Sequence, residues 1–455
     1  MPSITEINMT DLAQLSKVAD TEYLARMMDI ANRQAYYMGD QKKWLVDPKT
    51  KKPKPENITV NVAQKIVDQS VSMLFGGAPM ITAETEAQNA LIEALTDYNS
   101  DDVFFHSIAA AGSIGGHVYV KLIDEPDGVR WVSLNPALVS VFWRWDDAKR
   151  AAAYKIQWVE GTTDYRQDII ALDESWLVRD LKREKSADWT ITNEETWAYP
   201  FAPIVEWQNL PNYLGYYGVS DLTALPINDA INFTASNINS ILKNHAHPKT
   251  IGTGVRVDQV KETAVEGFWA IESESAKVYN LEMQSDLQSS MDFLGFLRAE
   301  FFSQQRAVDV SNLKDKIGQL TNFGLRVMFS DAMQKNATKQ LLYGWGLKEI
   351  MYRSLALKGV TIDPRSINVD FVDPLPVNDL EGANRIKTEI ESGIISKQTG
   401  SEELGYDWLE EAARMAAEKQ TSQTDLGASL LAAMRGFETQ DEGGDVGTVN
   451  ESDNA

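Results

Sequence analysis

The chain has 455 residues, of which 43% are hydrophobic, enough to bury the cores of about two to four domains. It contains no cysteine, so disulfides, thiolate metal sites and cysteine nucleophiles are excluded. It carries 66 acidic and 43 basic residues, and the net charge of −23 makes the surface as a whole poorly suited to gripping the phosphates of a nucleic acid.

Neither a membrane span nor an export signal is recognisable. No apolar run approaches the roughly 20 residues that a membrane-spanning helix needs. The first residues, Met1–Glu6, lack the basic and apolar regions of a signal peptide. We therefore expect a protein that is made in the cytoplasm and has no membrane partner.

The N-terminal part of the chain is predicted to be helical. Apolar residues at helical spacing indicate helices over Asp20–Tyr37, Val62–Leu74, Thr85–Tyr98 and Asp101–Gly112. The first two helices are separated by a segment rich in lysine and proline, Lys42–Pro55. This composition is typical of a solvated loop, and a nucleic-acid patch is the alternative.

A β-rich region follows. Gly112, Gly115 and Gly116 lack the spacing of a phosphate-binding loop and are expected to turn the chain from helix into sheet. Alternating sequences bounded by turn residues then predict an antiparallel, meander-like set of strands: Val118–Ile123, Val129–Leu134, Val139–Trp143, Ala152–Trp158, Thr163–Leu172, Ser175–Leu181 and Thr190–Thr196. A further strand is predicted at Phe201–Trp207.

Two helices flanking a small insert dominate the centre of the chain. The first, Ser220–Asn244, has amides and hydroxyls where a solvated helix carries Glu and Lys, which suits packing against copies of itself. The second, Asp286–Val308, is too apolar for one stripe on a lone surface helix. The insert, Lys249–Gln284, alternates β-favouring residues with charge. A helical hairpin with a β-rich excursion inside one globular domain would account for the same residues.

A long helix is predicted after this region. A polar connection, Asp309–Asn322, leads into a helical pattern over Phe323–Lys358. That pattern would span about 54 Å at roughly 1.5 Å per residue. Gly344 and Gly346 lie inside it and are expected to bend it.

The remainder is predicted to hold one strand and further helices. The strand is expected within Thr361–Val372 and the helices within Asn378–Lys419. From Gly436 onward the chain has six acidic residues and no basic ones. We expect this tail to be disordered.

No catalytic constellation is found. The four histidines lack the spacing of a metal site: His106, His117, His245 and His247. Serine-hydrolase and kinase motifs are absent from the sequence as well. We therefore expect no catalytic residue, no metal and no cofactor, and we expect the protein not to be an enzyme.

The order of several short motifs resembles that of a known family. The motifs are Asn57–Asn61, Ile66–Asp68, Leu74–Pro79, Gly115–Val120, Val132–Pro136, Pro203–Asn209, Gly218–Leu222, Pro226–Asn232 and Phe371–Pro376. Together they resemble the portal proteins of tailed bacteriophages, of the type found in long-tailed phages of Gram-positive hosts. The resemblance covers roughly residues 20–420, and its specific signal is the shared order. Pro226 departs from the pattern, since it would kink the first long helix or delay its start.

The resemblance implies an α+β, portal-like multi-domain subunit. Its parts would be an α/β wing (1–218 and 359–378), a two-helix stem (219–248 and 286–306), a small α/β clip (249–285), a tunnel loop (307–322), a long kinked helix (323–358), a helical crown (379–420) and an acidic tail (421–455).

It also implies a homo-oligomeric ring, usually of about twelve subunits, at one capsid vertex of the virion. Double-stranded DNA would be packaged and ejected through the ring, with transient contacts that do not depend on base sequence. The implied partners are the packaging motor (the terminase large subunit), the head-tail adaptor, and the major capsid and scaffolding proteins. Assembly would take place in the host cytoplasm. The alternatives are another phage structural or adaptor protein without a DNA channel, and an enzyme acting on nucleic acid.

The resemblance also implies roles for particular residues. The DNA-facing residues of the tunnel loop would be Lys314, Asp315, Lys316, Gln319 and Asn322. The residues packing between the stems of neighbouring subunits would be Asn228, Asn232, Asn237 and Asn239. The clip residues that bind partners would be Arg256, Asp258, Trp269 and Glu272, and a Trp269 that simply fills the core of the insert is equally expected. The kink of the long helix would come from Gly344 and Gly346.

Overall fold

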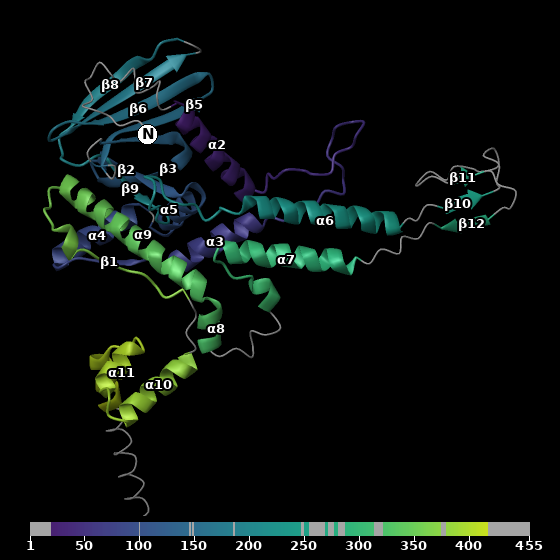
Figure 1. The fold of residues 1–455 in the computed structure, drawn as a ribbon. Coiled ribbons are helices and arrows are strands. Elements are labelled where there is room, and N and C mark those ends of the chain that lie inside the picture. The colour runs from purple at the N-terminus through teal and green to yellow at the C-terminus, as the bar shows by residue number, and fades with distance from the viewer. Residues whose placement is uncertain are drawn as a thin grey trace, which may run out of the picture. The chain divides into compact units, whose positions relative to one another are not determined.

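A computed structural model of the chain describes residues 20–99, 101–144, 147, 150–184, 187–246, 250–253, 269–271, 277–280, 287–313, 322–374 and 379–416. The chain divides into two compact units, with the boundary between Leu375 and Pro376. It is a mixed α and β protein (Figure 1), as the sequence predicts.

Helices and a three-stranded sheet build the main core of the first unit. The helices are α2 (Asp20–Tyr37), α3 (Val62–Leu74), α4 (Glu86–Tyr98), α5 (Asp101–Gly115) and α9 (Ser330–Leu357). Asn61 caps α3 by accepting a hydrogen bond from a backbone N–H, and Thr85 and Gln88 form a capping box at the start of α4. The helices predicted for the N-terminal part are thereby confirmed.

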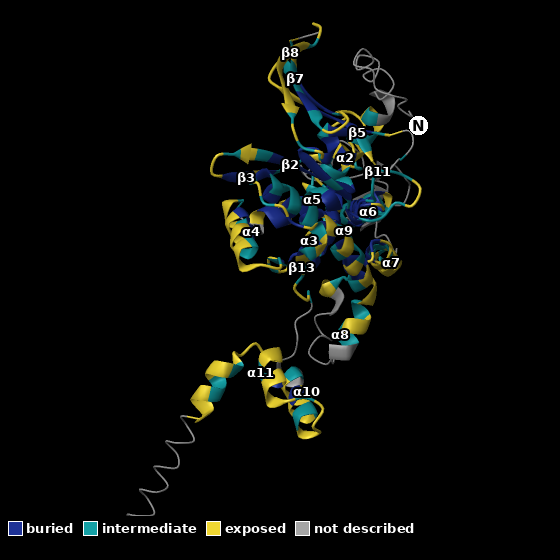
Figure 2. Cartoon of the chain, turned by 90° about the vertical axis from the view of Figure 1, so that its left-hand side faces the viewer, coloured by how far each residue is buried: buried dark blue, intermediate teal, exposed yellow. Residues whose placement is uncertain are grey.

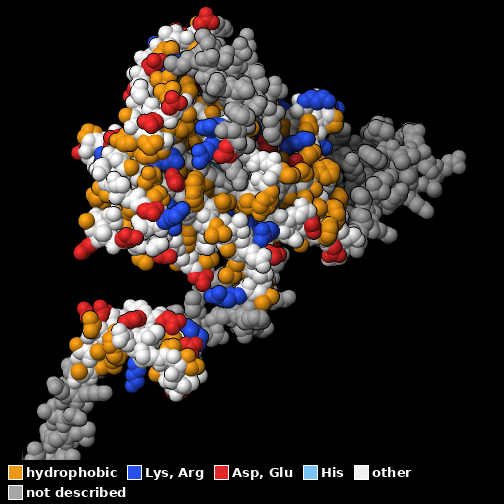
Figure 3. Space-filling model, turned by 60° about the vertical axis from the view of Figure 1, so that its left-hand side comes forward, with side chains coloured by type: hydrophobic (Ala, Val, Ile, Leu, Met, Phe, Trp, Pro, Cys, Tyr) orange, Lys and Arg blue, Asp and Glu red, His pale blue; other side chains and the backbone are white. Residues whose placement is uncertain are grey.

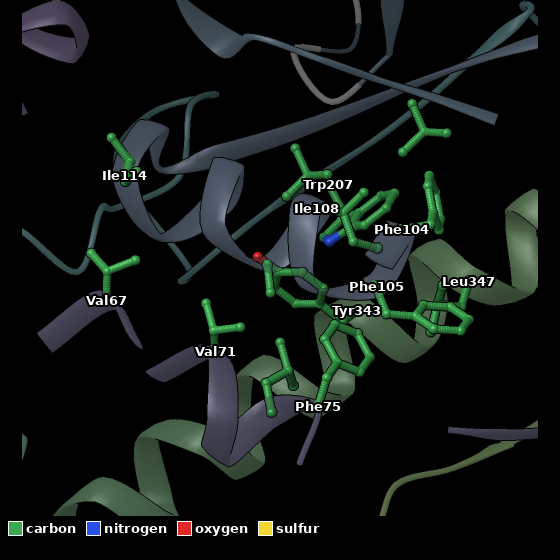
Figure 4. Close-up of a cluster of buried hydrophobic side chains, with 14 of the residues drawn as sticks. Val67, Val71, Phe75, Phe104, Phe105, Ile108, Ile114, Trp207, Tyr343 and Leu347 are labelled. Carbon is green, nitrogen blue, oxygen red and sulfur yellow. The ribbon is translucent and has the colours of Figure 1, made fainter. Parts of the chain in front are cut away.

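Aromatic side chains from four elements meet inside this core (Figure 4). Phe75, at the end of α3, has its ring centroid 5.4 Å from that of Phe105 on α5 and 6.0 Å from that of Tyr343 on α9. Tyr343 in turn lies 5.6 Å from Trp207. All four side chains are buried. Such pairs add roughly 0.5–1.5 kcal/mol each to the free energy gained from burying their area.

The predicted strands are present, but they form two sheets and not one meander. β2 (His117–Glu125) lies between β3 (Gly128–Leu134) and β9 (Ile204–Gln208), and both pairs are antiparallel. The chain leaves this sheet at a 3-10 turn, Pro136–Leu138, which is capped by Asn135. The second sheet is an antiparallel meander of β4 (Val139–Trp143), β5 (Ala151–Glu160), β6 (Thr163–Ala171), β7 (Trp176–Glu184) and β8 (Thr190–Trp197).

The outer edge of the second sheet is polar. β8 is exposed along nearly its whole length (Figure 2). Its residues include threonines, an asparagine and two glutamates. Charged and polar residues on an exposed edge discourage pairing with the strand of another molecule.

The two central helices lie side by side (Figure 1). They are α6 (Leu225–Ala246) and α7 (Gln288–Gln304), and they pack against each other. α6 begins later than the predicted Ser220. Pro226 therefore occupies the first turn, where its missing N–H leaves no helical hydrogen bond unmade. Pro226 thus fits a delayed start of the helix.

The insert between α6 and α7 holds a small sheet, which confirms the predicted β character. Its strands are β10 (Thr250–Thr253), β11 (Trp269–Ile271) and β12 (Lys277–Asn280). β10 is central, parallel to β11 and antiparallel to β12.

The long C-terminal helix is interrupted at Phe329. α8 (Asn322–Met328) ends there and α9 follows. Gly344 and Gly346 lie inside α9, which continues through both, and their role in bending the helix stays a prediction. A Cβ on Gly346 would lie 2.4 Å from the Trp207 ring, so this glycine permits the close approach of α9 to β9.

Both units also contain short elements. In the first unit, β1 (Met80–Thr82) pairs antiparallel with β13 (Asn368–Asp370). The second unit contains α10 (Asp379–Glu391), α11 (Lys397–Glu403) and a helical stretch at 408–416. None of the helices in the described ranges has the length and apolar character needed to cross a bilayer.

Candidate functional site

The residues predicted to contact DNA and packaging partners lie largely outside the described part of the chain. Those in ranges that the structure does not describe are Lys314, Asp315, Lys316, Gln319, Arg256, Asp258 and Glu272. Asn322 begins α8 and Trp269 begins β11, with only their backbones described. The tunnel-loop and clip assignments therefore stay predictions.

A strap formed by residues 41–61 covers the amide-rich face of α6. The backbone N–H of Ile58 donates to Oγ of Ser236 at 2.9 Å. The backbone N–H of Val60 donates to Oδ1 of Asn232 at 2.8 Å. The polar side chains of α6 thus bind backbone groups of a segment that belongs to none of the sheets.

The amides of α6 are used mainly inside the subunit. Asn228 and Asn232 both donate to Oε1 of Gln41, at 2.7 and 2.5 Å, and are only 0% and 1% exposed. The predicted packing of these two amides against a neighbouring subunit is wrong, because the strap already occupies their face. Asn239 donates to a backbone carbonyl of the strap and stays half-buried, as does Asn237. For these two residues, packing between subunits stays a prediction.

A buried ion cluster joins α9 to the segment that leads into α6. The two carboxylate oxygens of Asp221, just ahead of α6, pair with Lys335, at 2.9 Å, and with Lys339. Nζ of Lys339 also donates to Oγ of Ser70 on α3 at 2.7 Å and to Oγ of Ser113 on α5 at 2.9 Å. All three N–H groups of this ammonium are therefore used, and the cluster ties four segments together.

The same cluster reaches the end of α7. Nζ of Lys335 donates to the backbone carbonyl of Gln305, which directly follows α7, at 2.8 Å. The side-chain amide of Gln305 contacts Oγ1 of Thr223 at 3.2 Å. Both helices of the pair are therefore fixed to α9 at their roots, one through Asp221 and the other through Gln305.

Burial and charge oppose each other in the cluster. Burial alone would raise the pKa of Asp221, but the ammonium groups of Lys339 and Lys335 outweigh it and hold that pKa well below its ordinary value. Burial lowers the pKa of Lys339 to about 8, against the attraction of Asp221. Removing one member of such a buried pair costs roughly 3–5 kcal/mol, because the other charge is left without compensation.

The sequence did not predict this cluster, although the helical spacing of its two lysines is visible there. Lys335 and Lys339 are four residues apart and share the buried face of α9 with Tyr343 and Leu347. Lysines that lie on the same helix face as buried core residues indicate a buried ion pair. Their partner Asp221 lies 118 residues before Lys339, and no sequence spacing predicts that contact.

The helix pair leaves apolar side chains uncovered by its own subunit. Phe293 and Phe296 of α7 stack with ring centroids 6.3 Å apart and are 52% and 59% exposed. Met291 on the same helix and Phe233 on α6 are also about half exposed. Neighbouring exposed apolar side chains of this kind indicate contact with another molecule.

The first unit also has an open cavity of about 1060 Å³, which β9 and α9 help to line. Among its lining residues, Glu206 accepts hydrogen bonds from Tyr154, at 3.0 Å, and from Tyr216. Nε2 of His117 lies 3.3 Å from the same carboxylate. These polar groups contact one another, which is the pattern of a structural cluster. Within the described residues we find no group of side chains suited to hold a metal ion.

Comparison with known proteins agrees with the resemblance seen in the sequence. The model of the family described as "Phage portal protein, SPP1 Gp6-like" matches residues 17–425. No curated protein sequence matches the chain.

Solved chains from gene transfer agent particles are also similar. One comes from the virion of the native particle, with 12% identity and a TM-score of 0.46, covering 83% of this chain and 94% of that chain. A second comes from the neck of the native particle computed with C12 symmetry, with 12% identity, a TM-score of 0.44, and 83% and 99% coverage. A third comes from the neck of the empty particle computed with C6 symmetry, with 13% identity, a TM-score of 0.44, and 78% and 90% coverage.

Proposed function

Since the chain belongs to the SPP1 Gp6-like family of phage portal proteins, we propose that its copies form a ring at one capsid vertex, through which double-stranded DNA is packaged and later ejected. The match to the family over residues 17–425 carries this proposal. The ring would have about twelve subunits, the number that the family resemblance implies, and it would be closed by rotational symmetry, as is usual for homo-oligomers.

The exposed apolar side chains of the helix pair support assembly. Phe293 and Phe296 remain half exposed in the single subunit. Burying such a side chain completely contributes roughly 1.5–3 kcal/mol, so contact with a neighbouring copy would be favourable. A contact between two different faces of adjacent copies closes into a ring when the rotation between them allows it. The anchored roots of α6 and α7 would hold each pair in one orientation relative to the core of the first unit.

The charge of the chain supports passage of DNA without tight binding. Each phosphate that a protein neutralises strengthens binding and makes it dependent on salt, and this chain has a net charge of −23. On the face of the first unit seen in Figure 3, Lys and Arg side chains form small separate groups with acidic side chains among them. A wall of this character would let DNA slide.

The connection after α7 is the proposed DNA-facing loop, and its root is anchored. Nη2 of Arg298 donates to Oδ1 of Asp309 at 2.9 Å and to Oγ of Ser311 at 3.0 Å. Asp309 is therefore engaged at the root of the loop. Lys314 and Lys316 would be the cations that touch passing phosphates, because a lysine does so without fixed geometry.

The insert between α6 and α7 is the proposed docking site of the packaging motor and later of the head-tail adaptor. The residues that would contact these partners are Arg256, Asp258, Trp269 and Glu272. The major capsid and scaffolding proteins would meet the ring during assembly in the host cytoplasm. The finished protein would be a part of the virion.

Negative-stain images of the purified full-length chain test the proposal. The expected result is a population of rings with an axial hole. Particles of single-subunit size at every protein concentration would refute it.

A further inference from the structure

A hairpin with a lysine-rich tip projects from the strap. We call residues 45–54 the lysine hairpin; it belongs to the excursion between α2 and α3 beside α6 in Figure 1. The backbone N–H of Asp47 donates to the carbonyl of Lys52 at 2.9 Å. At the tip, Oδ1 of Asp47 accepts hydrogen bonds from the backbone N–H groups of Lys49, at 2.7 Å, and Thr50, at 2.8 Å. The tip is thus closed by its own aspartate.

Hydrogen bonds of Asn57 fix the base of the lysine hairpin. Nδ2 of Asn57 donates to the carbonyls of Leu45, at 2.6 Å, and Lys54, at 2.8 Å. Oδ1 of Asn57 accepts a hydrogen bond from the backbone N–H of Leu45 at 2.9 Å. These bonds fix the backbone of the loop before any ligand binds. Binding would therefore cost little additional conformational entropy of the backbone.

The lysine side chains of the tip are available to contact another molecule. Lys49, Lys51 and Lys52 are exposed, and none of the ion pairs among the described residues involves them. The one carboxylate of the hairpin, that of Asp47, is taken up by the backbone. Three ammonium groups within four residues are a local exception in a chain whose net charge is −23.

One of these lysines occupies a backbone position that favours glycine. Lys51 has a φ of 57°, in the left-handed region. A side chain there costs roughly 1–2 kcal/mol relative to the right-handed conformation. The backbone N–H of Lys51 donates to the carbonyl of Asp47 at 2.9 Å, so the turn holds this conformation and leaves the Lys51 side chain exposed.

We propose that the lysine hairpin binds the backbone phosphates of double-stranded DNA, independently of base sequence. The cations are all lysines, which act as flexible point charges and can touch the phosphates of a sliding duplex without the fixed geometry of the arginine fork. Residues 47–52 have no aromatic or large aliphatic side chain. Protein interfaces are depleted in lysine and depend on apolar or aromatic anchors, so a phosphate polyanion fits this tip better than a protein surface does.

This inference rests on the proposed function for the presence of DNA, and it adds a contact separate from the tunnel loop. The strap that carries the hairpin is bonded to α6 through Asn232 and Ser236. DNA held at the hairpin would therefore be held beside the helix pair.

The test is fluorescence anisotropy with a labelled DNA duplex, using the full-length protein over a series of KCl concentrations. The variant is Lys49→Ala/Lys51→Ala/Lys52→Ala. The matched control removes the same charge at exposed lysines elsewhere, Lys182→Ala/Lys387→Ala/Lys397→Ala. Each lost phosphate contact reduces the magnitude of the slope of log affinity against log salt concentration by about 0.9. The slope of the hairpin variant should therefore be smaller in magnitude by about 2–3. The variant should also bind the duplex at least about tenfold more weakly in low salt. The control should retain the wild-type slope.

Two results would overturn the inference. One is an unchanged salt slope in the hairpin variant. The other is a labelled polyglutamate peptide, matched in charge to the DNA, that binds the wild type at least as tightly as the duplex, because the site would then recognise an acidic protein. Native mass spectrometry of the same samples reports assembly separately. A hairpin variant that assembles but does not bind DNA supports the inference, and a wild type that binds DNA through the hairpin without forming rings would refute only the proposed function.

Discussion

Lys339 of α9 and Asp221 ahead of α6 form an ion pair whose side chains are only 1% and 0% exposed. The pair fixes the root of the α6–α7 helix pair to the longest helix of the core. An ion pair at this depth contributes little net stability over an apolar pair, but it strongly disfavours any arrangement in which one charge loses the other. We infer that it defines a single docking position for the helix pair.

Lys339→Met should destabilise the protein more than any exposed lysine substitution. The change leaves the carboxylate of Asp221 with Lys335 alone, and the expected loss in free energy of unfolding is about 3–5 kcal/mol. Lys348→Met, on the same helix but half-buried, is the control. Urea unfolding at one fixed subunit concentration measures both. Equal losses in the free energy of unfolding of the two variants would show that the ion pair of Lys339 has no special role in stability.

The acid side of the stability profile should depend on Asp221. The pKa of Asp221 is lower in the folded protein than in the unfolded chain, where it is about 3.9. Its ionisation therefore contributes stability that is fully present above that value and is lost as the pH falls below it. Asp221→Asn should flatten the fall in free energy of unfolding between about pH 5 and pH 2, whereas the exposed Asp331→Asn should keep the wild-type steepness. An equally steep fall in Asp221→Asn would contradict the assignment.

Two glycines of α9 should respond differently to the same substitution. Gly346→Ala places a methyl group 2.4 Å from the Trp207 ring and should cost about 1–3 kcal/mol. Gly344→Ala meets only Phe371, at 3.5 Å, and should be neutral or stabilising by up to about 1 kcal/mol, because alanine is the better helix former. Thermal unfolding midpoints of the two variants provide the comparison. A lower midpoint in Gly344→Ala than in Gly346→Ala would show that the glycines do not act through packing.

Much of the fold was predictable from local sequence signals. Alternation bounded by turn residues located the strands between His117 and Trp197 to within a few residues. The division into two sheets was not predictable, because β9 pairs with β2 across a long sequence separation. The start of α6 was misplaced because the residues from Ser220 continue the apolar spacing, and Pro226 marked the true beginning.

The candidate site was harder to predict than the fold, because its partners are distant in sequence. Asn228 and Asn232 were recognised as unusual, but their acceptor Gln41 lies 187 and 191 residues away. An amide-rich helix face indicates that some polar partner covers it, and it does not say whether the partner is another subunit or a strap of the same chain. For the same reason, the ion pair between Asp221 and Lys339 could not be predicted from the sequence.

The lysines of the tunnel loop should affect DNA packaging and not assembly. Lys314→Ala/Lys316→Ala removes the two cations from a connection whose other charges are acidic, so contact with passing phosphates should weaken while the ring still forms. The measurement is the length of DNA packaged and retained in particles built with the variant. Lys387→Ala/Lys397→Ala, with the same change in charge, is the control. Normal length and normal retention in the loop variant would mean that these lysines are not the DNA contact.

Native mass spectrometry of the full-length protein, over a range of protein and salt concentrations, tests the central claim most directly. We predict one dominant closed assembly, with about twelve subunits as the family resemblance implies. In it a neighbouring copy would cover the apolar side chains that are exposed on α6 and α7. The same assembly should weaken in Phe293→Ser/Phe296→Ser, which removes the stacked pair from α7. A wild-type protein that remains monomeric or dimeric under every condition would contradict the claim that this chain builds a portal ring.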